Sequence, residues 1–312
     1  MSVDEAEQPI GLDWGIGAIV TELRALREAS LAQRRRSAKP LKLPSQKGLR
    51  NVVEQLTAAL FPNRLGSRIL ANHSVDYFVG RLLDLALREL ADEIELELQF
   101  ATNATEVNER QRAEAVAFVG RFAAQLPKVR AQLETDIQAA YDDPAARSID
   151  EVLVCYPGVT AVMHYRFAHV LYELGAPLVA RIITELAHSQ TGIDIHPGAK
   201  IGESFFIDHG TGVVIGETAV IGRRVRIDHG VTLGAKRIAA DQDAAASSAD
   251  LRHPIVEDDV VIYAGATLLG RITIGRGSVI GGNVWLTRSV PPGSNITQAQ
   301  VRSEEFDAGS GI

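Results

Sequence analysis

The chain has 312 residues, of which 46% are apolar and 23% charged, a composition typical of a globular protein with one large or two ordinary domains. Its net charge of −7 argues against a nucleic-acid-binding protein, because no excess of basic residues is present to face phosphates. The single cysteine, Cys155, excludes a disulfide framework and favours a cytoplasmic location, and no apolar run predicts a membrane span.

The first part of the chain has the periodicity of helices. Residues 1–15 are acidic, lack a signal-peptide pattern and are expected to be disordered. Residues 16–192 are expected to form a helical domain used for oligomerisation. The stretch from Ala18 to Arg36 places four aliphatic residues on one stripe: Ile19, Leu23, Leu26 and Leu31. Residues 34–50 carry arginines and prolines and are interpreted as a solvated linker. Further on, two helices are expected to flank Pro177 and to stop at Gly192.

From Ile195 onward the hydrophobic period changes to six. Aliphatic residues lead thirteen units, namely Ile195, Ile201, Ile207, Ile215, Ile221, Ile227, Leu233, Val256, Ile262, Leu268, Ile274, Ile280 and Leu286. Such hexapeptide repeats are the signature of a β-helix, in which each unit is a short strand with a corner and three units close one coil. We therefore expect residues 193–292 to form a β-helix and residues 293–312 to be a flexible tail.

Two interruptions break this register. Two extra residues lie between Ile207 and Ile215, and an Ala/Ser/Asp-rich insertion at 236–251 separates Leu233 from Val256. The insertion is expected to leave the β-helix as an extruded loop. It is interpreted either as a lid over a binding face or as a tolerated surface insertion.

The tripeptide Asp-His-Gly occurs twice, starting at Asp208 and Asp228. A coil is eighteen residues, and the two-residue insertion makes it twenty at this point. His209 and His229 are therefore expected to stack on one face in adjacent coils, about 4.8 Å apart along the axis.

Several motifs resemble the serine O-acetyltransferases, a family of hexapeptide-repeat acyltransferases. They appear in the order DIHP, IDHGTG, IGET, VTLGA and RHP, and the similarity extends over roughly residues 136–292. The resemblance implies an α+β chain in which a helical domain precedes a left-handed parallel β-helix. It also implies acetyl transfer from acetyl-CoA to the hydroxyl of L-serine, a first step of cysteine biosynthesis, by a homotrimer that commonly pairs into a hexamer.

The chemistry itself requires a base, because a serine hydroxyl is a poor nucleophile at neutral pH. By motif, His209 matches the family's general base and Asp194 its orienting acid, in the manner of a catalytic dyad. The closure of the triangular coil is expected to bring these two residues together. Direct transfer requires no covalent enzyme intermediate and no metal.

The resemblance also assigns the residues that bind the substrates. Serine is a zwitterion: its carboxylate is expected to contact Arg252 and His253, and its ammonium group Asp143 and Asp208. Asp143 is interpreted alternatively as the opening of the turn at Pro144. Three small residues match positions where the backbone approaches the pantetheine arm of CoA, namely Gly234, Ala264 and Gly282.

At His229 the chain departs from the family, which usually has glutamine there. We interpret His229 either as a supporting hydrogen-bonding group near the thioester or as a surface histidine. Cys155 has no activating base at a fixed spacing and is interpreted as structural. His196 is left open between a corner hydrogen bond and a role behind the catalytic groups.

Two other enzyme classes are alternatives to a serine acetyltransferase. One is a hexapeptide acyltransferase acting on homoserine or a sugar. The other is a zinc enzyme similar to γ-class carbonic anhydrases, using His209 and His229 with His196 or His253 as a third ligand. A metal analysis and an acceptor panel separate them from the serine enzyme.

The C-terminus ends in a glycine-rich, acidic segment followed by Ile312. In the family such a tail often inserts into O-acetylserine sulfhydrylase, the next enzyme of the pathway. The resemblance therefore implies a complex with that enzyme through Ile312. The alternative interpretation is an ordinary frayed terminus.

Overall fold

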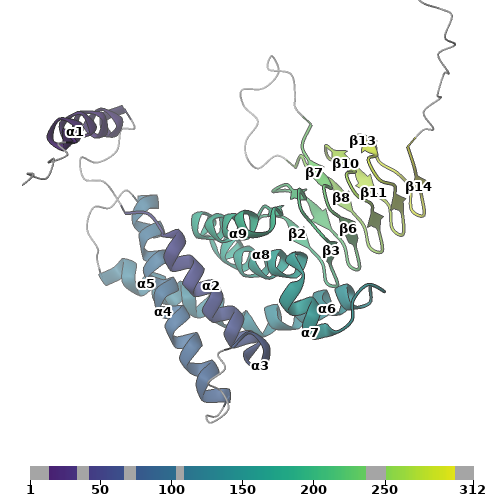
Figure 1. Cartoon of the computed structure of the whole chain (residues 1–312), viewed down its shortest axis with the longest axis horizontal. Coiled ribbons are helices and arrows are strands. Elements are labelled where there is room, and N and C mark those ends of the chain that lie inside the picture. Colours follow the sequence, from purple (N-terminus) through teal and green to yellow (C-terminus); the bar gives the residue numbers. More distant parts are fainter. Residues whose placement is uncertain (1–13, 34–41, 67–74, 103–108, 237–250, 299–312) are drawn as a thin grey trace, which may run out of the picture.

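The computed structural model describes residues 14–33, 42–66, 75–102, 109–236 and 251–298, which form a run of helices followed by a parallel β-helix (Figure 1). The expected α+β architecture, with a left-handed β-helix after a helical domain, is confirmed. Within the described ranges, no helix combines the length and apolarity needed to cross a bilayer. Most of the expected disordered N-terminus, most of the expected C-terminal tail, including Ile312, and most of the loop at 236–251 lie outside the described residues.

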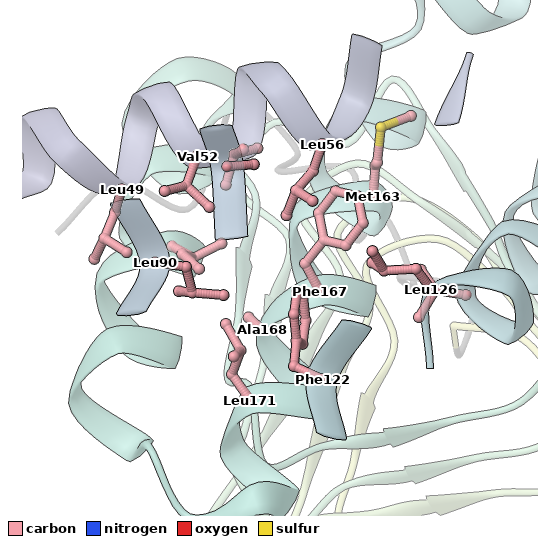
Figure 2. Packing of buried hydrophobic residues seen from close by; sticks show 14 of the residues in the cluster. Leu49, Val52, Leu56, Leu90, Phe122, Leu126, Met163, Phe167, Ala168 and Leu171 are labelled. Carbon is pink, nitrogen blue, oxygen red and sulfur yellow. The ribbon is translucent and has the colours of Figure 1, made fainter. Parts of the chain in front are cut away.

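Helices occupy the chain from residue 16 to residue 191. Their bounds are α1 Ile16–Gln33, α2 Gln46–Leu60, α3 Pro62–Leu65, α4 Val75–Thr102, α5 Glu109–Ala123, α6 Leu126–Tyr141, α7 Ile149–Cys155, α8 Pro157–Leu174 and α9 Pro177–Thr191. Helix α2 packs along α4, and α8 along α9. The core of the helical domain is built from large apolar side chains such as Leu56, Leu90, Phe122 and Phe167, all almost fully buried (Figure 2). Each such burial stabilises the fold by roughly 1.5–3 kcal/mol.

Two predicted helix ends are confirmed by the structure, and one predicted helix start is wrong. Gly175 and Gly192 end α8 and α9 in the left-handed conformation that glycine adopts without strain. The linker predicted to run to residue 50 instead ends earlier, because Ser45 caps α2 by accepting a hydrogen bond from the backbone N–H of Gly48. Glu93 of α4 holds this cap in place by accepting from the N–H of Ser45 at 2.6 Å.

Helix α1 forms as predicted, but its apolar stripe is not packed. Ile19, Leu23 and Leu26 are each about half exposed or more. Within the described part of the chain, this helix therefore presents an uncovered apolar face.

Fourteen short strands wind into the described β-helix. They are β1 Asp194–Ile195, β2 Lys200–Ile201, β3 Phe206–Asp208, β4 Val214–Ile215, β5 Val220–Ile221, β6 Arg226–Asp228, β7 Thr232–Gly234, β8 Ile255–Val256, β9 Val261–Ile262, β10 Thr267–Leu269, β11 Thr273–Ile274, β12 Val279–Ile280, β13 Trp285–Leu286 and β14 Asn295–Ile296. They form three parallel sheets: sheet A (β1-β4-β7-β10-β13), sheet B (β2-β5-β8-β11) and sheet C (β3-β6-β9-β12-β14). From β1 to β13, each strand pairs with the strand three positions further along, as a three-sided coil requires. Strand β14 pairs with β12, because the chain between β13 and β14 forms only an isolated bridge at Val290.

The predicted lead aliphatic residues fill the inside of the coil. Ile207, Ile227 and Ile262 stack in register on sheet C and are almost fully buried. The lead positions of the other sheets are buried as well, except for the partly buried Leu286 of β13. The coil extends past the predicted boundary at residue 292, because Ile296 of β14 pairs with Ile280. The six-residue period is interrupted before this strand, because Val290 follows Leu286 by four residues instead of six. Val290 nevertheless forms an isolated parallel β-bridge with Ile274.

A buried ion pair ties the helical domain to the first coil. The guanidinium group of Arg166 on α8 donates to both carboxylate oxygens of Asp136 on α6, each at 3.0 Å. The same group donates to the carbonyl oxygens of Ile201 and Gly202, and Asp136 also accepts from the N–H of Phe205. This network fixes α6, and the turn that follows it, against sheet C.

Candidate active site

The two Asp-His-Gly tripeptides stack as their spacing predicts. Asp208 pairs in register with Asp228 on adjacent strands of sheet C. The rings of His209 and His229 meet edge to face, with centroids 5.9 Å apart. His209 has a left-handed backbone (φ 56°), and its side chain is 79% exposed, so its imidazole is open to a substrate.

Arg226 gathers three carboxylates beside this histidine. Its guanidinium group donates to Asp208 at 2.7 Å and to Asp143, and its Nε lies 3.5 Å from Asp228. Asp143 comes from the turn after α6, whereas the two other carboxylates belong to sheet C. Arg226 therefore joins the helical domain to the β-helix at the place where the family resemblance puts the ammonium subsite.

Asp143 forms the turn at Pro144, and its contact with the substrate stays a prediction. Its Oδ1 accepts from the N–H of Ala145 at 2.9 Å, which forms the turn at Pro144, and its Oδ2 pairs with Arg226. The Ala145 hydrogen bond lowers the pKa of this carboxyl group most, and Arg226 lowers it further. Asp143 is thus ionised near neutral pH and can bind a cation.

Asp194 is not paired with His209 within this chain, contrary to the expected closure of the coil. Its Oδ1 accepts from Nη1 of Arg181 on α9 at 3.1 Å, and no hydrogen bond or ion pair among the described residues joins it to His209. The reason is that the imidazole of His209 points outward, with Nε2 at 3.9 Å from Asp208. The role of Asp194 as orienting acid stays a prediction.

A second group of residues surrounds the RHP motif. His253 is buried against Gly216, the residue after β4, and hydrogen-bonded to Thr218, and the exposed Arg252 lies 3.7 Å from Glu217. Arg271 donates to the carbonyl oxygens of Thr218 and His253 at 2.6 and 2.9 Å. Burial lowers the pKa of His253, and the charge of Arg252 lowers it further, so the imidazole is neutral at neutral pH.

The two groups lie at different corners of the β-helix. His209 follows β3 at the corner from sheet C to sheet A, whereas Thr218 and Arg252 precede strands of sheet B at the corner from sheet A to sheet B. A face of the coil is six residues, so neighbouring corners are separated by roughly 15–20 Å. One serine molecule cannot contact both groups of a single chain.

The small residues matched to CoA binding divide over the same two corners. Ala264 and Gly282 lie above His229 at the first corner, where Gly265 donates to the carbonyl oxygen of His229 and Asn283 to that of Ala264. Gly234 lies at the second corner, directly above Gly216 in sheet A. The first corner therefore carries a column of small residues that leads away from His209.

The remaining histidines of the described part of the chain lie away from His209 and contact other groups. His196 accepts from the N–H of Gly198 at 3.1 Å, which is the corner hydrogen bond, and His164 and His169 contact carbonyl oxygens. Among the described residues, one trio holds its possible ligand atoms within 4.8 Å: Glu185, His188 and Asp194. That trio contains neither His209 nor His229, and Arg181 binds both of its carboxylates, so the geometry does not favour the zinc enzyme.

Sequence reasoning missed three residues at this site: Arg226, Arg181 and Thr218. Each contacts a predicted site residue through a side-chain hydrogen bond. Arg226 could have been predicted from its charge and from its register in the repeat, which places it near Asp208 and Asp228. The contact of Arg181 required knowing how α9 packs on β1, which a helical period does not give.

Residues 253–288 match the family model "Bacterial transferase hexapeptide (six repeats)". A Synechococcus elongatus protein named "Serine acetyltransferase, plasmid" is 53% identical over 304 residues, covering 96% of this chain and 95% of that protein.

Two solved structures are similar over most of their length. Serine acetyltransferase isoform 3 from Entamoeba histolytica, in complex with cysteine, has a TM-score of 0.69 at 35% identity, covering 87% of this chain and 88% of that chain. Soybean serine acetyltransferase complexed with serine has a TM-score of 0.51 at 30% identity, covering 81% of this chain and 96% of that chain.

Proposed function

The chain belongs to the serine acetyltransferase family, and we propose that it transfers the acetyl group of acetyl-CoA to the hydroxyl of L-serine, giving O-acetyl-L-serine and CoA. The 53% identity over nearly the whole chain carries this proposal. The proposal is supported by the chemistry of the site, which offers an open histidine, a carboxylate cluster and a separate cationic group.

In the proposed reaction, His209 takes the proton of the serine hydroxyl as its oxygen attacks the thioester carbonyl. The new C–O bond forms, the C–S bond breaks, and the proton passes from His209 to the departing CoA sulfur. Asp194 is the proposed orienting group for His209. Asp143 and Asp208 bind the ammonium group of serine, and Arg252 and His253 bind its carboxylate.

We propose that the site is completed between copies of the chain in a homotrimer. The separation of the His209 group from the Arg252 group over two corners of one chain supports this arrangement. Acetyl-CoA would lie in the same crevice, with Ala264 and Gly282 from one chain and Gly234 from the next. The uncovered apolar face of α1 supports the pairing of two trimers through the helical domains.

His229 is proposed as a supporting group beside His209. Its imidazole contacts the edge of His209 and stands at the foot of the small-residue column. This position supports the proposal that His229 hydrogen-bonds near the thioester without taking the hydroxyl proton.

We also propose that the pathway context of the family applies. The lone cysteine supports a cytoplasmic location. A complex with O-acetylserine sulfhydrylase through Ile312 is proposed from the terminal sequence, and deleting Ile312 should weaken binding to that enzyme.

The test is release of the CoA thiol from acetyl-CoA with L-serine, L-homoserine or a panel of sugars as acceptor. We expect turnover with L-serine at a kcat of about 1–10³ s⁻¹ and much slower turnover with the others. Turnover on a sugar but not on serine would show another hexapeptide acyltransferase, and activity that needs added zinc would show the metal enzyme.

A further inference from the structure

Thr218 makes four hydrogen bonds to two consecutive residues. Its Oγ1 accepts from the backbone N–H groups of Arg252 and His253 at 3.0 and 3.1 Å. Its own N–H donates to Nδ1 of His253 at 3.1 Å, and Oγ1 lies 2.9 Å from the same nitrogen. Thr218 is 34 and 35 residues before these partners, so it ties the end of the long insertion to the preceding coil.

These contacts determine which ring nitrogen of His253 carries the proton. A backbone N–H donates only, so Nδ1 must accept from Thr218 and cannot itself be protonated. Both lone pairs of Oγ1 are used by the two backbone donors, and its hydroxyl proton therefore also points to Nδ1. In the neutral imidazole the proton is then on Nε2.

The position of the ring is fixed from its other side by Gly216. A Cβ at this position would overlap Cδ2 and Nε2 of His253. The imidazole therefore lies against the backbone of β4 and the residue after it, where only glycine leaves room. The glycine and the threonine of the IGET motif thus act on the same ring.

We propose that Thr218 is a positioning residue that presents Nε2–H of His253, together with the Arg252 side chain, to the carboxylate of the acceptor substrate. This inference rests on the proposed function, which makes that carboxylate the ligand of Arg252 and His253. Thr218 acts through His253 and does not contact the reacting atoms. It accounts for the glycine and threonine of IGET as parts of the acceptor subsite.

The decisive variants are Thr218→Val, which keeps the shape but removes the hydroxyl, and Thr218→Ser, which keeps the hydroxyl. We expect Thr218→Val to raise the KM for L-serine about 10-fold or more, because the ring and the Arg252 backbone lose their hydrogen bonds. The KM for acetyl-CoA should stay within about twofold. Thr218→Ser should restore the KM for serine to within about threefold of the unchanged protein.

A matched control is Thr273→Val. Thr273 lies on β11 of sheet B, and among the described residues its hydroxyl has no hydrogen-bond partner. It should leave both KM values unchanged. An unchanged KM for serine in Thr218→Val, or an equal rise in the KM for acetyl-CoA, would overturn the proposal.

Two further measurements separate positioning from folding. Long-range ¹H–¹⁵N NMR on full-length protein labelled with [¹⁵N]histidine should show His253, assigned by its loss in His253→Gln, with a proton on Nε2 alone; a proton on Nδ1 would overturn the proposal. Gly216→Ala should raise the KM for serine as Thr218→Val does, because the methyl group displaces the ring; an unchanged KM in this variant counts against the proposal. If the unchanged protein fails to acetylate serine, the proposed function fails, while the tautomer still tests Thr218.

Discussion

His209 and His229 carry the same side chain in the same register, but their surroundings differ. His209 stands next to Asp208, in reach of Asp143, and its ring is open to solvent. His229 is one coil further along and contacts His209 edge to face. Stacking alone therefore does not make the two histidines equivalent.

This difference predicts unequal losses on substitution. His209→Ala should lower kcat by about 10²–10⁴-fold, because no other group takes the hydroxyl proton. His229→Gln keeps a polar side chain of similar reach and should lose no more than about fivefold. Steady-state rates with L-serine measure both, and comparable losses would show that the base has been assigned to the wrong histidine or is shared.

At the level of residues, the sequence was informative wherever a contact follows the repeat. The register of Asp208 with Asp228 follows from an eighteen-residue coil with a two-residue insertion, and the structure confirms that pairing. The contacts made by Arg226 and Thr218 do not follow from the period alone. Arg226 reaches Asp143 across 83 positions and Thr218 reaches His253 across 35, and a hydrophobic period does not encode side-chain hydrogen bonds over such separations.

Among the helices, α9 depends on a residue of another helix for its first turn. Its N-terminus has no capping side chain of its own, since it begins after Ala176. Glu97 of α4 supplies the cap by accepting from the N–H groups of Leu178 and Val179, both at 2.8 Å. Because α9 leads directly into β1, this cap helps to place Arg181 and Asp194.

Removing this cap should therefore cost stability rather than chemistry. Glu97→Ala leaves two donors without an acceptor and should lower the free energy of unfolding by about 1–3 kcal/mol. Glu97→Gln retains an acceptor and should lose less, and the exposed Glu114→Ala on α5 is the control. Urea unfolding measures these effects. A Glu97→Ala protein as stable as the control would show that water replaces the carboxylate at no cost.

The elements themselves were predicted where the period was unbroken. The strands from β1 to β13 follow the thirteen lead aliphatic residues, whereas β14 was missed because Val290 shortens one unit by two residues. The apolar stripe of α1 correctly predicted a helix. A period of 3.6 residues identifies the apolar face of a helix, but it does not show which part of the protein packs against that face.

For the whole molecule, the observation that matters most is that the His209 group and the Arg252 group lie at different corners of one β-helix, which is why we propose that each chain supplies one half of a shared site. The ion pair of Arg166 and Asp136 locks α6 to the first coil, so Asp143 is held at the His209 corner. The helical domain therefore cannot carry Asp143 to the Arg252 corner without breaking a buried, bidentate pair. Sequence motifs placed all these residues in one site, but motif order cannot tell whether they come from one chain or from two.

A mixing experiment tests this arrangement directly. His209→Ala and Arg252→Ala each inactivate one half of the site, so neither homotrimer should be active. In every mixed trimer of these two chains, one of the three interfaces joins an intact His209 to an intact Arg252. Random mixing at equal amounts should therefore restore about a quarter of the unchanged activity, since about three quarters of the trimers are mixed and each has one working site of three.

The measurement is CoA thiol release from co-expressed, differently tagged chains, purified through both tags to select mixed trimers. After this selection the expected activity rises to about a third of the unchanged value. The control is a mixture of two His209→Ala chains, which should stay inactive. No recovered activity in mixed trimers would place the whole site within one chain, and would require the His209 and Arg252 corners to approach each other by a movement of the β-helix that its continuous parallel pairing does not allow.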